Sequence, residues 1–180
     1  MITEIDLQIL DWIQAHLRCG FLDRIVPVIT MLGEAGWIWI LLAVVLLARK
    51  KTRKLGLAVA ISLVVDLVLC NLLLKPLVAR TRPFTYRPEL TLLVSPPKDF
   101  SFPSGHTAAS FAAASALAFA HCRHWRPAMV LAVLIALSRL YLFVHYPTDV
   151  LSGTILGVLC GLIGAFCGKK VMTKCRKNSN

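Results

Sequence analysis

Long apolar runs, separated by short polar or basic turns, dominate the chain. The apolar segments cover residues 22–48, 55–74, 104–120, 127–144 and 147–168. A helix needs about 20 residues, most of them apolar, to cross a bilayer, and these segments lie near that length. The pattern predicts an all-α integral membrane bundle with about five transmembrane helices, in a single domain over residues 1–180.

The first apolar segment is the least regular of the five. Its uncharged part, residues 35–48, has 14 residues, so a span must reach back past Glu34 toward Ile25. Gly33 and Gly36 flank Glu34 and predict a break in the helix there. Glu34 then lies either in mid-membrane or near the surface, if the early part of the segment lies flat.

Residues 1–20 show a different pattern and predict an amphipathic helix. Ile5, Ile9, Ile13 and Leu17 recur at helical spacing, and acidic residues occupy other positions. The segment is too polar to span a bilayer. One interpretation places it in the membrane interface, and the other packs it on the rest of the fold.

Composition agrees with a membrane protein. Hydrophobic residues make up 57% and charged residues 16% of the chain, against about 25% charged in an ordinary soluble domain. The net charge of +11 would suggest nucleic acid in a soluble protein. Here the basic residues lie mostly between apolar runs, so we expect membrane lipids and no nucleic acid as partners.

The distribution of charge predicts an orientation. Residues 49–54, 121–126 and 169–180 hold five, two and five of the 20 Lys and Arg, and no Asp or Glu. Positive loops stay in the cytoplasm. The loop 75–103 and the turn 145–149 then face the extracytoplasmic side of a multi-pass protein in the cell membrane.

Two apolar runs between Phe102 and Asp149 flank one short basic turn. A hairpin of two helices brings both ends of this stretch back to the same level. His106 at its start and His145 near its end therefore meet, with Arg139 and Asp149 close by.

Three cations on the extracytoplasmic side indicate an anion site. Lys75 ends the second span, and Arg82 follows seven residues later. Arg139 lies inside the fourth span, where an arginine is by default functional. Arginine and lysine together suit a phosphate. Ser104 and Gly105 open the third span, where a hydroxyl and free backbone N–H groups also favour an anion.

Two histidines and a carboxylate complete the candidate site. Asp149 can accept a hydrogen bond from Nδ1 of His145 and leave Nε2 free to attack. His106 can protonate the leaving oxygen. The same three residues are also a conceivable metal site, but three nearby cations oppose a metal ion. We expect no metal and no cofactor.

The chain resembles the type 2 phosphatidic acid phosphatase family, which also includes vanadium haloperoxidases. Its three signatures, K-x6-R-P, P-S-G-H and S-R-x5-H-x3-D, are complete and in order at residues 75–83, 103–106 and 138–149. The resemblance implies a phosphohistidine on His145, with His106 as general acid, Asp149 orienting, and no metal. It implies phosphate binding by the cations and by the start of the third span, namely Lys75, Arg82, Ser104, Gly105, His106 and Arg139.

These features predict a membrane phosphatase acting on a lipid phosphate or diphosphate. Small bacterial members of the family resemble undecaprenyl-diphosphate or phosphatidylglycerophosphate phosphatases. An outward-facing site favours undecaprenyl diphosphate, with phosphatidylglycerophosphate or phosphatidic acid as alternatives. A non-enzymatic lipid-phosphate binder or flippase would need the cations but no nucleophile with its orienting carboxylate. A haloperoxidase would be expected to be soluble.

Overall fold

The structure is a computed structural model that describes residues 2–177, with side chains described for residues 3–171. The predicted basic tail, residues 169–180, therefore lies partly outside the described residues. The helices are α1 (Ile2–Leu17), α2 (Gly20–Leu32), η1 (Glu34–Gly36), α3 (Trp37–Ala48), α4 (Arg53–Asp66), η2 (Leu67–Leu74), α5 (Lys75–Val78), η3 (Pro83–Tyr86), α6 (Gly105–Phe119), α7 (Trp125–Tyr141) and α8 (Pro147–Lys177).

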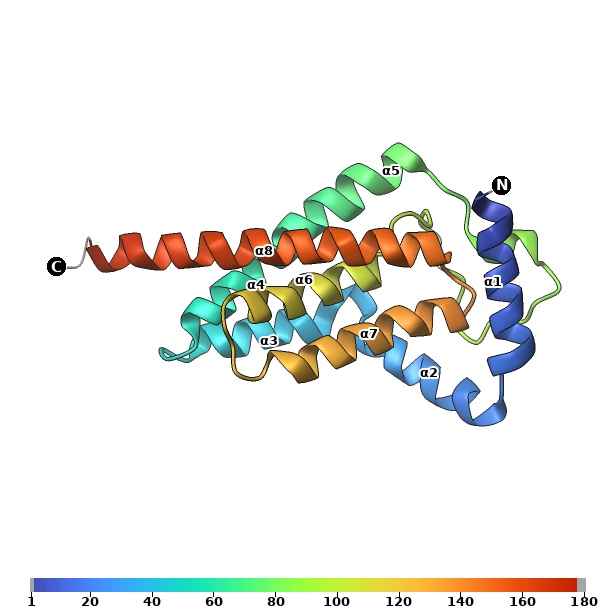
Figure 1. Cartoon of the computed structure of the whole chain (residues 1–180), viewed down its shortest axis with the longest axis horizontal. Helices are drawn as coiled ribbons and strands as arrows, with labels where there is room; N and C mark the ends of the chain where they lie inside the picture. Colours follow the sequence, from blue (N-terminus) through green and yellow to red (C-terminus); the bar gives the residue numbers. More distant parts are fainter. Residues whose placement is uncertain (1, 178–180) are drawn as a thin grey trace.

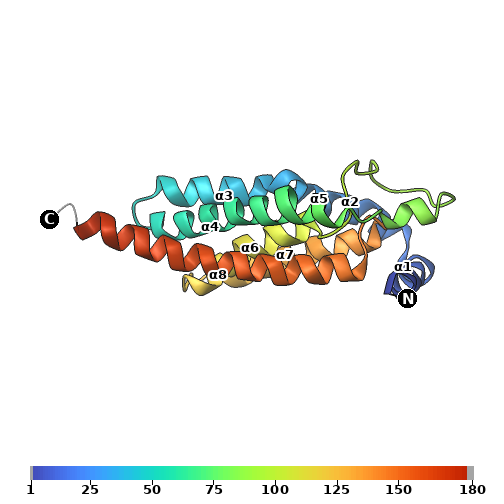
Figure 2. The same cartoon turned by 90° about the horizontal axis from the view of Figure 1, so that it is seen from above.

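The long helices run side by side as a bundle around α6 (Figures 1 and 2). α8 packs along α6 and α4, and α3 and α7 pack against α4 and α6 respectively. The basic turns 49–54 and 121–126 lie at one end of the bundle (Figure 1). The polar segment 79–104 and the turn between α7 and α8 lie at the other end, so the predicted hairpin does bring His106 and His145 to one level.

A stripe of glycines on α8 allows its close approach to α6 and α4. A Cβ at Gly157 would lie 2.4 Å from the carbonyl oxygen of Ala108, and a Cβ at Gly164 would lie 2.4 Å from that of Ala58. Small residues let helix backbones meet in this way inside membranes, where tight packing replaces the hydrophobic drive. The stripe is recognisable in the sequence, because its glycines recur every three or four residues.

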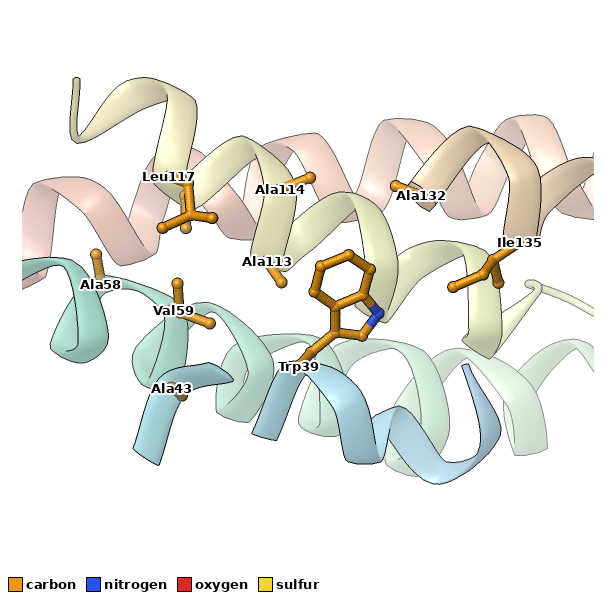
Figure 3. Packing of buried hydrophobic residues seen from close by; sticks show 10 residues of the cluster. Trp39, Ala43, Ala58, Val59, Ala113, Ala114, Leu117, Ala132 and Ile135 are labelled. Carbon is orange, nitrogen blue, oxygen red and sulfur yellow. The ribbon is translucent and has the colours of Figure 1, made fainter. Parts of the chain in front are cut away.

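Larger side chains fill the space between α3, α4, α6 and α7 (Figure 3). Trp39 of α3 is buried and donates its indole N–H to Oγ of Ser110 on α6, at 2.9 Å. Val59 and Ile135 are fully buried in the same cluster. This cluster fixes α3 against α6 and so positions the helix break that precedes α3.

The predicted break in the first apolar segment is present. α2 and α3 meet at an angle of 41° across η1, where Ala35 and Gly36 have φ values of +47° and +68°. Glycine adopts this left-handed backbone easily, whereas alanine does so at some cost. The break turns Glu34 toward the same end of the bundle as His106.

The second apolar segment departs from a regular α-helix. Residues 67–74 form a π-helix, and helical winding continues four residues beyond the predicted end at residue 74, to Val78. In an α-helix of about 3.6 residues per turn, Asp66 and Lys75 would lie on opposite sides, since nine residues make about two and a half turns. The wider winding places both of them on the cavity side.

Two further segments differ in length from the sequence prediction. α7 ends at Tyr141 rather than at residue 144, because residues 142–146 form the turn that carries His145. α8 continues to Lys177 rather than ending at residue 168. Basic residues beyond residue 168 interrupt the apolar run but do not disfavour helix, since Lys and Arg are good helix formers.

The protein is an integral membrane protein. Among the described residues, Arg53–Tyr86 and Pro147–Val171 are long and apolar enough to cross a membrane, and the bent pair α2–α3 makes a third candidate span. α6 has 15 residues and α7 has 17, which is at or below the usual length of a span.

α1 crosses the site end of the bundle, roughly perpendicular to α8 (Figure 1). Its inward face buries Leu10 and, unusually for a carboxylate, Asp6. Its outward face exposes Ile5, Ile9 and Trp12. The helix therefore packs on the rest of the fold, as the second interpretation predicted, and its outward face is apolar.

Candidate active site

A cavity of about 1180 Å³ opens at the site end of the bundle. The predicted site residues that line it are Lys75, Arg82, Gly105, His106, Arg139 and His145. The other two, Ser104 and Asp149, are fully buried behind this wall. Residues from five different segments of the chain thus meet around one space, which we call the site cavity.

His145 lies in the turn between α7 and α8 and is almost fully buried. Its Nε2 atom is 3.3 Å from Nη1 of Arg82, and its Nδ1 atom is 3.5 Å from Oδ2 of Asp149. Arginine only donates, so Nε2 acts as the acceptor and the proton belongs on Nδ1. Burial, with Arg139 and Arg82 nearby, lowers the pKa of His145 to about 3, although Asp149 opposes the shift. His145 is therefore a neutral imidazole whose Nε2 lone pair faces Arg82.

Asp149 is held by more donors than the sequence predicted. Its Oδ2 atom accepts bonds from the hydroxyl of Ser101 and from the backbone N–H of Tyr146. Its Oδ1 atom accepts from Nη1 of Arg80 at 2.6 Å. The distance of 3.5 Å to His145 is longer than a normal hydrogen bond, so these other partners fix the carboxylate beside the imidazole.

Lys75 and Arg82 share an anionic partner that sequence reasoning missed. The carboxylate of Asp99 pairs with Nζ of Lys75 through one oxygen and with Nη2 of Arg82, at 2.6 Å, through the other. Burial alone would raise the pKa of Asp99, but the two cations outweigh it and the pKa falls to about 2. Asp99 therefore lies, as a carboxylate, between the two cations for which the sequence predicted a phosphate.

Arg139 points into the site cavity from the last turn of α7 and is 3% exposed. Its Nη1 donates to the hydroxyl of Thr30 on α2, and its Nε has no hydrogen-bond partner among the described residues. A buried guanidinium with an unused donor suits an anion that arrives with the ligand.

His106 stands in the first turn of α6. Its Nε2 atom is 3.4 Å from Oε2 of Glu34, and Gly33 is so close that a Cβ there would lie 3.0 Å from its ring. The carboxylate of Glu34 is mostly exposed, whereas the imidazole is mostly covered. The helix break thus brings a carboxylate to the second histidine, and the two glycines around Glu34 were its signal in the sequence.

The start of α6 is shaped for close approach. A Cβ at Gly105 would lie 3.2 Å from Oδ1 of Asn71 and 3.7 Å from Nζ of Lys75. The hydroxyl of Ser104 pairs with that of Thr107 at 2.9 Å, and it does not cap the helix. The first N–H groups of α6 thus remain without a side-chain cap next to the cations.

The site cavity continues away from these polar groups along an apolar wall. Ile40 and Val44 of α3 and Leu63 and Leu67 of the facing segment line it there. These side chains come from two helices that run toward the basic-turn end of the bundle (Figure 2). The cavity therefore joins a cationic pocket to a groove lined by apolar residues of the candidate spans.

The model of the PAP2 superfamily matches residues 51–172 of the chain. The chain belongs to this superfamily. It is 38% identical over 122 residues to an undecaprenyl-diphosphatase of Sulfolobus acidocaldarius, covering 67% of this chain and 59% of that protein. It is 31% identical over 142 residues to undecaprenyl-diphosphatase BcrC of Bacillus subtilis, covering 79% of this chain and 72% of that protein.

A solved structure is similar over nearly the whole chain. The crystal structure of a transmembrane PAP2 type phosphatidylglycerolphosphate phosphatase from Bacillus subtilis superposes with a TM-score of 0.75 at 28% identity. The match covers 96% of this chain and 87% of that one. Membership of the PAP2 superfamily thus agrees in sequence and in fold, while the relatives differ in the substrates that they are named for.

Proposed function

We propose that the protein is a membrane lipid phosphatase that works through a phosphohistidine on His145. One observation carries the proposal. His145, whose Nε2 atom faces Arg82, lines a cavity that is also walled by Lys75 and Arg139, and the same cavity continues along apolar residues. A lipid phosphate has the matching halves, an anionic head and an apolar tail.

In the proposed first step, Nε2 of His145 attacks phosphorus and the bond from phosphorus to the leaving oxygen breaks. His106 gives that oxygen a proton, and Asp149 stabilises the imidazolium that forms. The cations Lys75, Arg82 and Arg139 and the N–H of Gly105 hold the phosphoryl oxygens. The hydroxyl of Ser104, which pairs with Thr107 in this structure, would turn from Thr107 to join them. Donors aimed at the developing charge stabilise the transition state by several kcal/mol, which is a large share of a catalytic effect.

In the second step, a water attacks the phosphohistidine and His106 takes its proton. The bond from phosphorus to nitrogen breaks, inorganic phosphate forms, and His145 returns to its neutral state. No residue carries a net change over the cycle, and no metal takes part.

The substrate we favour is undecaprenyl diphosphate, which would yield undecaprenyl phosphate and phosphate. Two relatives are named undecaprenyl-diphosphatases, and a site that faces outward suits the recycling of a cell-wall lipid carrier. Phosphatidylglycerophosphate is the second candidate, because the similar crystal structure is of an enzyme named for it. A panel of polyprenyl diphosphate, phosphatidylglycerophosphate and phosphatidic acid, compared by kcat/KM, decides between them.

For the topology, we propose five spans with α1 in the outer interface and the site on the extracytoplasmic side. In support, the basic turns 49–54 and 121–126 lie at the end opposite the site cavity (Figure 1). In a cysteine-free background, a cysteine at Lys98 should react with an impermeant thiol reagent in intact cells, and one at Lys51 should not. The reverse labelling pattern would overturn the orientation.

The reaction itself is tested with purified protein in detergent and excess chelator. Wild type should release phosphate from a short-chain lipid phosphate, and His145→Ala should not, while both give the same melting temperature. A stopped reaction should contain an acid-labile phosphoryl group on wild type alone. If both proteins bind the lipid and neither releases phosphate, the binder or flippase is correct. If chelator abolishes activity, the metal-free mechanism is wrong.

A further inference from the structure

Arg80 lies between the two cations of the first signature but does not line the site cavity. Its Nη1 atom is 2.6 Å from Oδ1 of Asp149 and 2.7 Å from Oγ1 of Thr148, and its Nη2 atom is 2.8 Å from Oδ2 of Asp6. The guanidinium also lies over the ring of Tyr146, 3.7 Å from its centre. Arg80 thus uses its planar fork to hold two carboxylates from opposite ends of the chain.

The second carboxylate, Asp6, belongs to α1 and is 2% exposed. Besides Arg80, it accepts bonds from the backbone N–H of Thr148, at 3.3 Å, and from the hydroxyl of the same residue. Both groups belong to the first turn of α8, which also carries Asp149. α1 lies outside residues 51–172, the part of the chain that the family model matches.

We propose that Arg80 and Asp6 form a positioning relay for Asp149, so that α1 is part of the working site. The inference rests on the proposed function, in which Asp149 supports His145 as the nucleophile. Neither residue touches the phosphate in this proposal. They act through the orientation and the charge of the Asp149 carboxylate.

The relay first fixes the orientation of the Asp149 carboxylate. Arg80 holds Oδ1, while Ser101 and the N–H of Tyr146 hold Oδ2. The carboxylate plane is therefore fixed with Oδ2 on the side of His145. Without the guanidinium, Oδ1 has no other charged partner among the described residues, and a buried carboxylate that loses its charged partner is strongly destabilised.

The relay also changes the electrostatic environment of His145. The charged and titratable groups around His145 come from several elements: Asp149 of α8, Arg139 of α7, His106 of α6, and Arg82 of the polar segment 79–104. Asp149 is the anion among them, and Arg80 offsets part of its charge. Asp6 in turn offsets part of the charge of Arg80, so the two relay residues act on His145 with opposite signs.

The signs lead to a prediction that a purely structural role would not share. Removing the Arg80 cation leaves the negative charge of Asp149 uncompensated. The imidazolium of His145 is then stabilised, and the pKa of His145 rises. Removing the charge of Asp6 leaves the positive charge of Arg80 less compensated and so lowers the pKa of His145. The acid limb of the kcat–pH profile, which reports the enzyme–substrate complex, should therefore move up in Arg80→Met by about 1 pH unit and move down in Asp6→Asn.

The chain offers a matched control on the same helix. Asp11 of α1 pairs with Arg87 of the same polar segment at 2.7 Å, and neither residue lines the site cavity. Asp11→Asn and Arg87→Gln remove an ion pair that ties α1 to the fold without reaching Asp149. We expect both variants to keep the kcat and the pH profile of wild type.

The experiment measures kcat, KM and pH profiles with one short-chain lipid phosphate. Arg80→Met should lower kcat about 100-fold and Asp6→Asn about 10-fold, by analogy with the 10-fold to 100-fold losses seen when residues that orient metal ligands are removed. KM should change little in either variant. Arg80→Lys keeps the charge but not the fork, and should keep the pH profile while losing part of kcat.

Three results would overturn the relay: equal kcat losses in Asp6→Asn and Asp11→Asn, acid limbs that move in the same direction, or a loss confined to KM. If Arg80→Met does not fold, Asp6→Asn and Arg80→Lys still decide. The outcome is separate from that of the proposed function, which fails instead if His145→Ala remains active.

Discussion

The middle of the bundle and its site end are held together by different forces. In the middle, α8 meets α6 and α4 through glycines at which any side chain would collide with backbone. At the site end, ion pairs and hydrogen bonds join α1, the segment 79–104, α7 and α8. The middle therefore depends on the absence of side chains, and the site end depends on the presence of particular polar ones.

This contrast separates the part of the protein that stabilises the fold from the part that carries the candidate chemistry. Close backbone packing in the middle tolerates no added volume but makes no demand on charge. The site end buries charged groups of both signs, which costs free energy unless each group is paired. Variants of the two regions should consequently fail in different ways: those at the site end by losing activity, and those in the middle by losing stability.

His106→Ala should separate chemistry from folding most clearly. Without a proton donor for the leaving oxygen, kcat for a lipid monophosphate should fall by about 10²-fold to 10⁴-fold. The melting temperature in detergent should stay close to that of wild type, because the imidazole is not part of the glycine contacts between α8, α6 and α4. A large drop in melting temperature would mean that the histidine mainly supports the fold.

Gly157→Val should do the reverse. Its Cβ would meet the Ala108 carbonyl oxygen at 2.4 Å, and overpacking of this kind typically costs about 1–3 kcal/mol or more. We expect a lower melting temperature and a reduced yield of monodisperse protein, with normal kcat for the folded fraction. Gly20→Ala is the control, since nothing lies within 4 Å of a Cβ there.

Asp99→Asn tests the carboxylate that occupies the cation pair. Because the pKa of Asp99 is about 2, the group is ionised at every pH of interest and competes with phosphate for Lys75 and Arg82. Its removal should strengthen inhibition by inorganic phosphate about 10-fold, a change of about 1.4 kcal/mol. Glu89→Gln, at an exposed position of the same segment, should leave inhibition unchanged. Weaker inhibition in Asp99→Asn would show that Asp99 holds the cations in place instead.

Glu34→Gln should give the smallest effect and depend on the leaving group. Glu34 lies 3.4 Å from Nε2 of His106, so its carboxylate can orient the imidazole that gives the proton. A phosphate leaving group has a second pKa near 6 and needs little acid assistance, whereas an alkoxide needs it fully. We expect kcat to fall several-fold for a polyprenyl monophosphate and hardly at all for the diphosphate. Equal losses for both substrates would argue against this role.

Much of the bundle follows from local pattern. The apolar runs, the break at Gly33–Gly36 and the glycine stripe of α8 are legible in the sequence, because each depends on residue type and spacing within one segment. The π-helix before Lys75 was not, since nothing in residues 67–74 distinguishes five-residue winding from ordinary α-helix. Its effect, which is to turn Asp66 and Lys75 to one side, depends on the neighbours that pack around it.

Residue type and spacing alone identify the groups of the candidate site, namely the two histidines, the three cations and the carboxylate in their signatures, and they predict the hairpin that brings the histidines to one level. The partners of these groups depend on the tertiary structure. Asp6 meets Arg80 across 74 residues, and Ser101 meets Asp149 across 48. Such contacts leave no periodic signal, because they are selected by the packing of whole helices and not by the local spacing of side chains.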